Sequence, residues 1–219
     1  MSAADYAFDS DLPLSDLPGG TSVLVSGPGS AGLDTLVHQL LDVSNRDDEG
    51  MVAISADKDG ASYLRNYRST AGIVDRSLTN VVDCCGDSGL STDDRIADVS
   101  GPSDLTSINM ELSACIDDLR FDGVERVRAG LVSVTPLVAA CDDMRDIYRF
   151  VQNITSRARR TDGLFVCAID PEADTGDFDS GASITTGLSR AFKHHVELRD
   201  GDGGPEVRVD GGSWQSVAL

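Results

Sequence analysis

The sequence predicts an α/β fold with three layers, in which helices flank a mainly parallel central sheet and a C-terminal antiparallel hairpin extends the sheet. Three observations predict this fold. Short apolar runs recur along the chain, segments with helical periodicity separate them, and the last two apolar runs are joined by a turn rich in Gly and Asp. Strands separated by helices favour parallel pairing, because each connection must cross a face of the sheet.

Five short apolar runs have the length and composition of strands that are buried on both faces of a parallel sheet. They are Ser22–Ser26, Met51–Ser55, Asn80–Cys84, Ala129–Val134 and Leu164–Ile169. We expect the first and the fourth to lie beside each other in one sheet, through Val23–Ser26 and Leu131–Val134.

Three segments between these runs repeat apolar residues at intervals of three and four, which is the spacing of one helix face. The first stripe is Leu33, Leu36, Val37, Leu40 and Leu41. The second is Leu105, Ile108, Leu112, Cys115, Ile116 and Leu119, and the third is Met144, Ile147, Tyr148, Val151, Ile154 and Ala158. We expect all three stripes to pack in the core.

The end of the chain has a strand pattern without helices. His194–Gly212 contains two strands around a turn of Gly and Asp residues, so it predicts an antiparallel hairpin at the sheet edge. Trp214 follows directly and is expected to pack against this hairpin.

Two acidic, Gly-rich segments, Gly86–Gly101 and Asp170–Gly181, are predicted to be loops. The second follows the carboxyl end of a strand, which is the side of an α/β sheet where ligands bind. Asp170 and Glu172 either face such a site or belong to a solvated acidic loop, which is the default interpretation of acidic loop residues.

Length and composition bound the organisation of the chain. With 219 residues, 40% of them hydrophobic, the chain fits one domain over residues 1–219, with residues 1–20 as a leader and 194–212 as the edge hairpin. It has no apolar run near the roughly 18 residues that a membrane span needs, and its first residues are acidic, unlike those of a signal peptide. We therefore expect a cytoplasmic protein that makes no contact with a membrane.

The charge is strongly negative. The formal net charge is -19, 31 of the 37 acidic residues are Asp, and Lys58 and Lys193 are the two lysines. Short hydrated carboxylates keep a protein soluble when salt screens charge repulsion, so this composition is typical of a halophilic, haloarchaeal protein. It argues against direct binding of nucleic acid, whose phosphates require Lys and Arg. The main basic cluster, Arg157, Arg159 and Arg160, is interpreted as a solvated helix end.

The cysteines and histidines do not predict a metal site. The five cysteines lack paired CxxC spacing, and an odd number does not indicate a disulfide framework, so we expect free thiols in the core. His194 and His195 open a predicted strand while His38 lies on a distant helix, so a structural role is expected for all three.

The stretch VLVSGPGSAGLDTL, Val23 to Leu36, has the frame of a phosphate-binding loop, in which an apolar strand leads through glycines into a helix. Together with LSDLPGG before it, VRAGLVSVTPLVAACDDMRDIYRFVQNITSRARR, GLFVCAIDPE and the final hairpin, it resembles the KaiC-like branch of the RecA superfamily, and divergent haloarchaeal members in particular. The resemblance covers nearly the whole chain. It implies a RecA-like P-loop fold with a nucleotide site at the loop.

The loop departs from the motif GxxxxGK[ST]. Gly27 and Gly32 match, but Leu33 stands where lysine neutralises phosphates, and Asp34 stands where a hydroxyl binds magnesium. Thr35 is one place late, about 100° further round the helix. Phosphate could therefore be held by backbone N–H groups alone. The candidate nucleotide-binding residues are Gly27, Gly29, Ser30, Ala31, Gly32 and Thr35.

Two further elements of the machinery that the resemblance implies are altered. Val132 occupies the position of the metal-organising aspartate, and Asp57 and Lys58 stand where KaiC-like enzymes have a pair of acidic residues that activate water. Asp57 is therefore the one candidate catalytic residue. Phosphoryl transfer depends on positioned positive charge and metal, so these losses predict a pseudo-ATPase.

Two functions follow from these expectations. The first is a non-catalytic regulatory or scaffold protein, which associates with itself or with an active KaiC-like relative, requires no cofactor and binds ATP or ADP weakly. The alternative is an ATPase with a displaced catalytic cation. The loop glycines are compatible with both functions, because a tight turn between strand and helix requires glycine whether or not a nucleotide binds.

Overall fold

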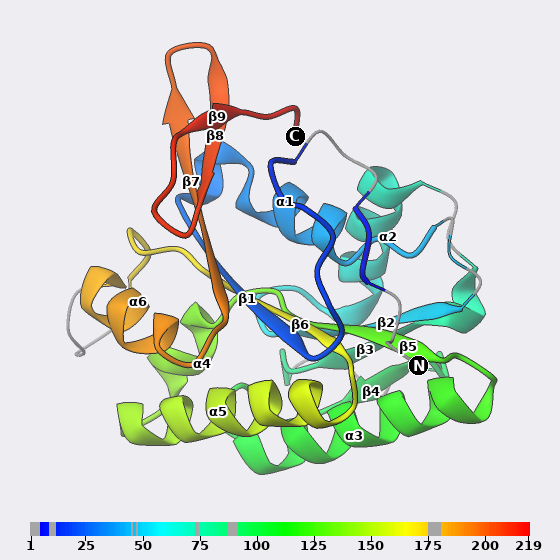
Figure 1. Cartoon of the computed structure of the whole chain (residues 1–219). Coiled ribbons are helices and arrows are strands. Elements are labelled where there is room, and N and C mark those ends of the chain that lie inside the picture. The colour runs from blue at the N-terminus through cyan, green and yellow to red at the C-terminus, as the bar shows by residue number, and fades with distance from the viewer. Residues whose placement is uncertain are drawn as a thin grey trace.

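The computed structural model describes residues 5–8, 12–44, 46, 48–72, 75–86, 92–174 and 181–219. Within these residues the strands form one sheet with the order β4-β3-β2-β5-β6-β1-β7-β8-β9 (Figure 1). The strands are β1 (Thr21–Ser26), β2 (Glu49–Ser55), β3 (Thr79–Asp83), β4 (Ile96–Asp98), β5 (Arg126–Leu131), β6 (Leu164–Ile169), β7 (His194–Gly201), β8 (Gly204–Val209) and β9 (Gln215–Ser216). All pairs from β4 to β7 are parallel, while β8 and β9 join antiparallel.

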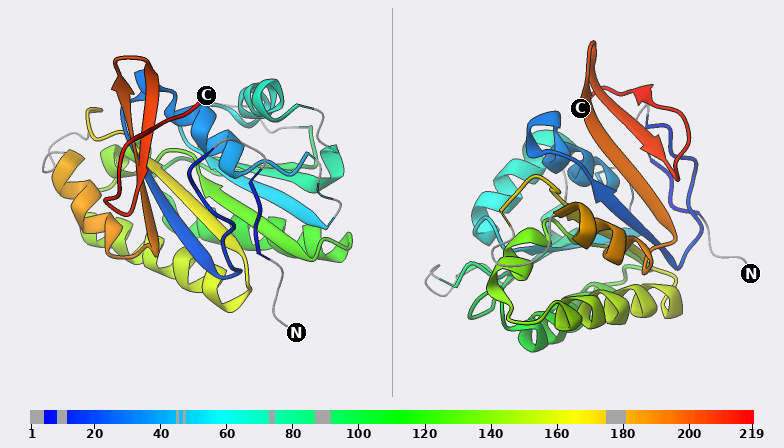
Figure 2. Two further views of the ribbon diagram at one scale, coloured as in Figure 1. Left: turned by 45° about the horizontal axis from the view of Figure 1, so that its top comes forward. Right: turned by 90° about the vertical axis from the view of Figure 1, so that its left-hand side faces the viewer.

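Helices cover both faces of this sheet (Figure 2). They are α1 (Leu33–Leu40), α2 (Gly60–Ala71), α3 (Leu105–Phe121), α4 (Thr135–Ala140), α5 (Met144–Arg160) and α6 (Gly181–Ser189), with 3-10 turns η1 (Gly29–Ala31) and η2 (Arg76–Leu78). One apolar cluster joins the sheet to α3, α4, α5 and α6, and a second joins it to α1, α2, the N-terminal segment and the hairpin. The predicted α/β fold, with a mainly parallel sheet between helical layers and a C-terminal antiparallel hairpin, is confirmed.

The three predicted apolar stripes fall on α1, α3 and α5, and most of their residues are buried. Each of α2, α3 and α5 begins after an Asp whose carboxylate accepts a backbone N–H of the first turn. This capping satisfies donors that a helix leaves unpaired at its start. The arginines Arg157, Arg159 and Arg160 occupy the last turn of α5, as their interpretation as a helix end predicted.

Several elements differ from the sequence prediction. β5 spans Arg126–Leu131, whereas the predicted run was Ala129–Val134. The start of the strand was missed because two arginines interrupt its apolar pattern. β5 and β1 share one sheet, as predicted. The prediction that they lie beside each other was wrong, because β6 lies between them. The predicted loop over residues 86–101 contains β4, a strand of three residues that is too short to give a pattern. Its residues 87–91, and residues 175–180 of the second predicted loop, lie outside the described part.

Further elements were not predicted at all. The helices α2, α4 and α6 and the strand β9 have short or mixed apolar patterns. Trp214, in contrast, packs against the hairpin as expected, with the guanidinium carbons of Arg199 and Arg208 at 4.1 and 4.7 Å from its ring centroid.

The five cysteines are free, as expected. Cys84, Cys115 and Cys167 are buried, whereas Cys85 and Cys141 are only half-buried, so the prediction that all five lie in the core was wrong for these two. Among the helices that the structure describes, none has the length and apolar character needed to cross a membrane.

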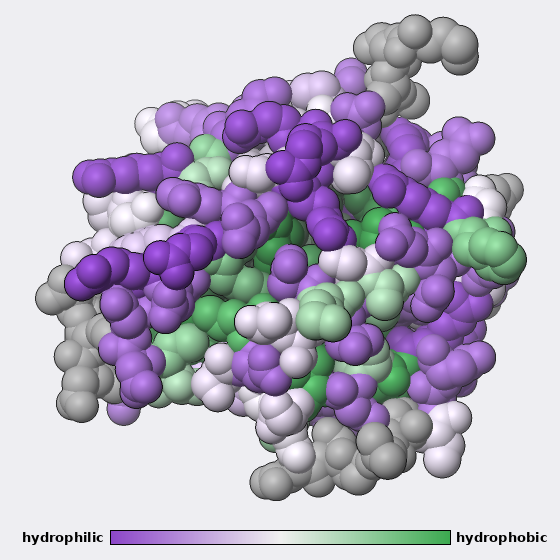
Figure 3. All heavy atoms as spheres, turned by 90° about the horizontal axis from the view of Figure 1, so that it is seen from below, coloured by the Kyte–Doolittle hydropathy of each residue, from purple (hydrophilic) through white to green (hydrophobic). Residues whose placement is uncertain are grey.

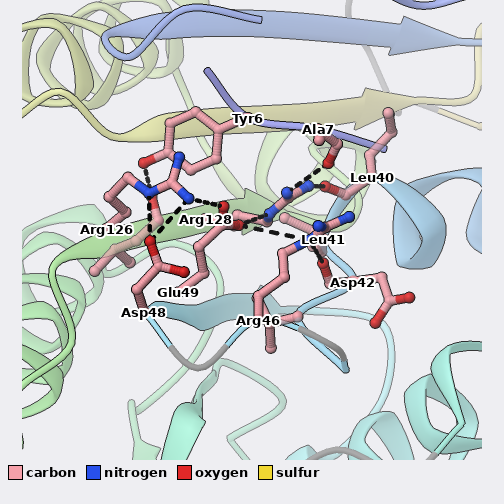
Figure 4. Close-up of polar contacts among 12 residues, drawn as sticks. Tyr6, Ala7, Leu40, Leu41, Asp42, Arg46, Asp48, Glu49, Arg126 and Arg128 are labelled. Carbon is pink, nitrogen blue, oxygen red and sulfur yellow. Dashed lines mark hydrogen bonds and ion pairs between the residues drawn. The ribbon is translucent and has the colours of Figure 1, made fainter. Parts of the chain in front are cut away.

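A buried ion pair joins the sheet to its surroundings (Figure 4). Arg128 of β5 is fully buried, and its Nε lies 2.5 Å from Oε2 of Glu49, the first residue of β2. The same guanidinium donates to the carbonyl of Leu40 at the end of α1, at 2.9 Å, and to the carbonyl of Ala7, at 2.7 Å. Arg126 binds the second oxygen of Glu49 at 2.7 Å.

The N-terminal segment closes over this ion pair. The ring of Tyr6 lies 5.2 Å from the guanidinium carbon of Arg126 and 5.3 Å from that of Arg128. Its hydroxyl donates to the carbonyl of Asp162 at 3.0 Å, and burial raises the pKa of Tyr6 to about 12, so the hydroxyl stays protonated. Cation–π contacts of this kind stabilise by about 1 kcal/mol or more when they are desolvated.

Replacing Arg128 with Met should destabilise the protein by about 3 kcal/mol or more, because Glu49 would keep a buried charge with one partner fewer. Adding Glu49→Gln should recover part of this loss. Urea unfolding at constant high salt measures both effects. In the matched control, Arg149→Met, the exposed pair with Asp146 is lost, and the change should stay within about 1 kcal/mol. Equal losses for the buried and the exposed pair would contradict this account.

Candidate functional site

The candidate loop joins β1 to α1 at the carboxyl edge of the sheet. Two of its glycines are required by the backbone. Gly32 has φ +96°, in the left-handed region that favours glycine, and a Cβ on Gly27 would lie 2.5 Å from the carbonyl oxygen of Leu198 in β7. The turn therefore explains these two glycines without a ligand.

A side chain of the protein itself occupies the loop. The N–H of Gly29 donates to Oδ2 of Asp170, at 2.9 Å, and Oδ1 of the same carboxylate accepts the N–H of Glu172. Asp170 directly follows β6, the strand beside β1, so the topology brings it to the loop. The question left open by the sequence is thus answered for Asp170, which faces the candidate site. A donor that the motif would offer to a phosphate is used by this internal carboxylate.

The other candidate loop residues have internal contacts or are covered. The hydroxyl of Ser30 donates to Oδ2 of Asp200, at 3.1 Å, and Ala31 is buried. Thr35 is the third residue of α1 and is half-buried. A second carboxylate, that of Asp200 in β7, therefore lies at the loop.

The position of the missing lysine is a packing position. Leu33 is 4% exposed and belongs to the apolar cluster between the sheet, α1 and α2. Residues near the C-terminus lie along the same helix (Figure 1), where the carbonyl of Ala218 accepts from the side chain of Gln39. Leu219 lies against the loop, since a Cβ on Gly32 would be 3.2 Å from its Cδ1. Apolar side chains thus fill the volume beside the first turn of α1.

A lysine does reach this turn, from a different element. Nζ of Lys58, in the loop between β2 and α2, lies 2.7 Å from Asp34 and 2.9 Å from Asp57. Partial burial opposes its charged form, but the hydrogen bonds to both carboxylates outweigh that effect and raise its pKa above the ordinary value. Asp34 and Asp57, the candidate catalytic residue, are therefore both engaged by one ammonium group.

Val132 provides no metal ligand, because its side chain is apolar and 1% exposed in the same cluster as Leu33. Its N–H donates to the carbonyl of Ile54 at 3.1 Å. Among the described residues, no three His, Cys, Asp or Glu side chains are grouped so that they could hold a metal ion.

A cavity of about 430 Å³ lies between the loop and β7. Its wall includes three carboxylates, Glu172, Glu197 and Asp200, and one cation, Arg199. Arg199 already donates twice to Glu206, at 2.9 and 2.7 Å. Such a wall repels a polyphosphate more than it attracts one. The residues that line the cavity are Ser26, Gly27, Pro28, Ser30, Pro171, Glu172, Glu197, Leu198, Arg199, Asp200 and Trp214.

Sequence reasoning missed the contribution of β7 to this site. β7 pairs in parallel with β1, so the residues after its middle lie at the same edge as the loop. Nε2 of His195 lies 2.7 Å from the hydroxyl of Ser26, and Nδ1 of His194 lies 2.7 Å from Asp210. The alternation of Val196 and Leu198 with polar residues identified β7 as a strand, but it did not indicate that β1 is its neighbour.

The pH dependence of stability should report the burial of His195. Burial lowers the pKa of His195 below 6.5, although Glu197 and Asp210 oppose this. The neutral ring is thus favoured in the folded state, and its contribution is present above pH 6.5 and lost as pH falls towards the lower folded pKa. The wild type should lose up to about 1.4 kcal/mol more per pH unit in this window than His195→Gln. Urea titrations of both proteins measure the difference, and parallel curves would contradict it.

Comparison with known proteins gives one family. No curated protein matches the sequence. A family model described as a family of unknown function, DUF7504, matches residues 20–208, which include the loop, every helix that the structure describes and the strands from β1 to most of β8. Because this match covers most of the chain, the protein belongs to the DUF7504 family.

Proposed function

We propose that this protein is a non-catalytic, RecA-like relative of the KaiC branch, which acts in the cytoplasm as a regulatory or scaffold protein through association with other protein chains. One observation carries the proposal. The loop that would bind phosphate is occupied from within by Asp170, and the position of its lysine is filled by the buried Leu33.

The electrostatics of the loop support this proposal. Hydrolysis of a nucleotide requires cations aimed at the charge that develops on the transferred phosphoryl group. Lys58 and Arg199 lie near the loop, and each is bound to carboxylates. Asp170 and Asp200 add negative charge directly at the loop backbone. A triphosphate would therefore meet more carboxylates than cations.

The apolar packing around the loop supports the same conclusion. Leu33 and Val132, which stand at two positions where the resemblance implies lysine and aspartate, both lie in the apolar cluster that holds α1 on the sheet. Their side chains stabilise the fold by roughly 2 kcal/mol each through burial. Buried apolar side chains at these two positions can stabilise a protein that binds partners. They cannot take part in phosphoryl transfer.

An alternative function is favoured by one contact. Lys58 binds Asp34 at the first turn of α1, so a rotation of its flexible side chain would bring a cation towards the loop. On this hypothesis the protein is an ATP-binding or slowly hydrolysing KaiC-like ATPase whose cation has moved from α1 to the loop after β2.

Purified protein in molar KCl with magnesium and ATP should release phosphate no faster than a blank without protein. The reason is the loss of the lysine, the hydroxyl and the aspartate at Leu33, Asp34 and Val132. Lys58→Met is the decisive companion variant. Hydrolysis by the wild type that disappears in Lys58→Met would overturn the proposal and establish the alternative.

Nucleotide binding should be weak in the wild type and stronger once the internal carboxylate is neutralised. Asp170→Asn removes the negative charge at Gly29, and adding Asp34→Thr removes a second carboxylate from the first turn of α1. The melting temperature of the double variant should rise with ADP or ATP concentration, whereas that of the wild type should not.

Replacing Leu33 with Lys restores the motif in sequence, but it should lower the melting temperature because it buries an ammonium group in the core. Asp202→Asn, a neutralisation at the exposed hairpin turn, is the matched control and should leave nucleotide binding unchanged. A wild type that already binds ATP tightly would contradict the proposed occupancy of the loop by Asp170.

A further inference from the structure

The layer formed by α3 and α5 differs in character at its two ends. Both helices connect parallel strands on the same face of the sheet, so they run in the same direction and their C-terminal ends lie together. A guanidinium nitrogen of Arg120 in α3 lies 3.4 Å from the carbonyl of Thr161, directly after α5. Each helix has 17 residues, which places the two ends about 25 Å apart.

The C-terminal end carries an exposed aromatic residue among arginines. Phe121 is 92% exposed, which makes it the more exposed of the two large apolar side chains that the described surface presents. Arg120 precedes it, and Arg157, Arg159 and Arg160 end the neighbouring helix. None of these four arginines has a carboxylate within 4 Å among the described residues. We call this set the basic knob.

The N-terminal end of the same layer carries a groove of about 530 Å³ with acidic residues. Leu105 and Phe150 provide apolar surface in its wall, and Asp104, Asp142 and Asp146 line it. Asp146 binds Arg149 at 3.0 Å, whereas Asp142 has no partner among the described residues. The remaining lining residues are Ser103, Thr106, Asn109, Ala140, Cys141, Arg149 and Asn153. We call this set the acidic groove.

Helix stability explains part of this arrangement but not all of it. Carboxylates at helix starts and arginines at helix ends both interact favourably with the helix dipole. That effect does not require an aromatic side chain exposed beside the arginines, nor an open groove between the helix starts. Figure 3 looks onto this face, where hydrophilic side chains predominate and apolar ones show between them.

We propose that a second copy of this chain docks head to tail on this layer, so that Phe121 of one copy enters the acidic groove of the next and its arginines meet Asp142 and Asp104. The inference rests on the proposed scaffold function, for which it names the partner. A second copy is the occupant because the chain itself carries both complementary surfaces, on opposite ends of one helix pair. An interface of two different surfaces leaves a free knob and a free groove at the ends, so it extends into longer assemblies or closes into a ring.

Salt should favour this association. With a net charge of -19, two copies repel each other at low ionic strength, and at 1 M salt the screening length falls to about 3 Å. Direct contacts between arginines and carboxylates, and burial of the phenyl ring, persist under those conditions better than repulsion across the whole surface. Aromatic and Arg side chains are also the residues that most often dominate binding at protein interfaces.

Sedimentation velocity in molar KCl over a wide range of protein concentration tests the proposal. The wild type should form species larger than a monomer, and Phe121→Asp should weaken their formation about tenfold or more. Phe121→Leu keeps an apolar knob and should retain most of the association. Asp142→Arg should weaken association from the groove side, while the same charge change at Asp202, on the hairpin turn, should have no effect.

Mixing two defective proteins gives the sharpest result. Phe121→Asp keeps its groove and Asp142→Arg keeps its knob, so at a concentration where each alone is monomeric, a mixture of the two should form a discrete dimer and nothing larger. A wild type that stays monomeric at every concentration, association that survives Phe121→Asp, or a mixture that stays monomeric would each overturn the proposal. Such a failure leaves the proposed function standing, because that depends on the hydrolysis and nucleotide-binding measurements. Those measurements can fail in turn while self-association persists.

Discussion

The buried pair between Arg128 and Glu49 is the contact on which the rest of the structure depends. One guanidinium group connects β5 to β2, to the end of α1 and to the N-terminal segment; the contacts to Glu49 and Leu40 are buried, and the contact to Ala7 is partly buried. Transferring such charges from water is unfavourable, so the pair stabilises the fold only because every partner is in place. It fixes the amino edge of the sheet. The candidate loop lies at the opposite, carboxyl edge of the sheet.

At the carboxyl edge, both the charges and the packing are unfavourable for binding a polyphosphate. Where the motif leads one to expect a cation at the start of α1, an aliphatic side chain lies in the core, and the nearby lysine is held between two carboxylates. Asp170 satisfies a backbone donor in the loop. Under the proposed function, the loop would be the frame of a nucleotide site whose electrostatic sign is inverted, which is the physical basis of the proposed non-catalytic role.

The sequence was sufficient for the fold and for part of the site, for reasons that particular residues make clear. Apolar runs identified β1, β2, β3 and β6 because both faces of these strands are buried, whereas Arg126 and Arg128 hid the start of β5. The sequence alone was sufficient to identify Leu33, Asp34 and Val132 as departures from the motif residues that the resemblance implies. It was not sufficient for the contacts of Lys58 and Asp200, because each depends on which strands are neighbours, and local pattern does not specify strand order.

The contact between Asp170 and Gly29 also behaves as a tethered competitor. A carboxylate attached to the adjacent strand is present at the loop at an effective concentration of millimolar or more. Any free anion must exceed that concentration, or bind more tightly than a carboxylate, before it can occupy the same N–H group. The contact therefore sets a threshold of ligand concentration below which the loop does not respond.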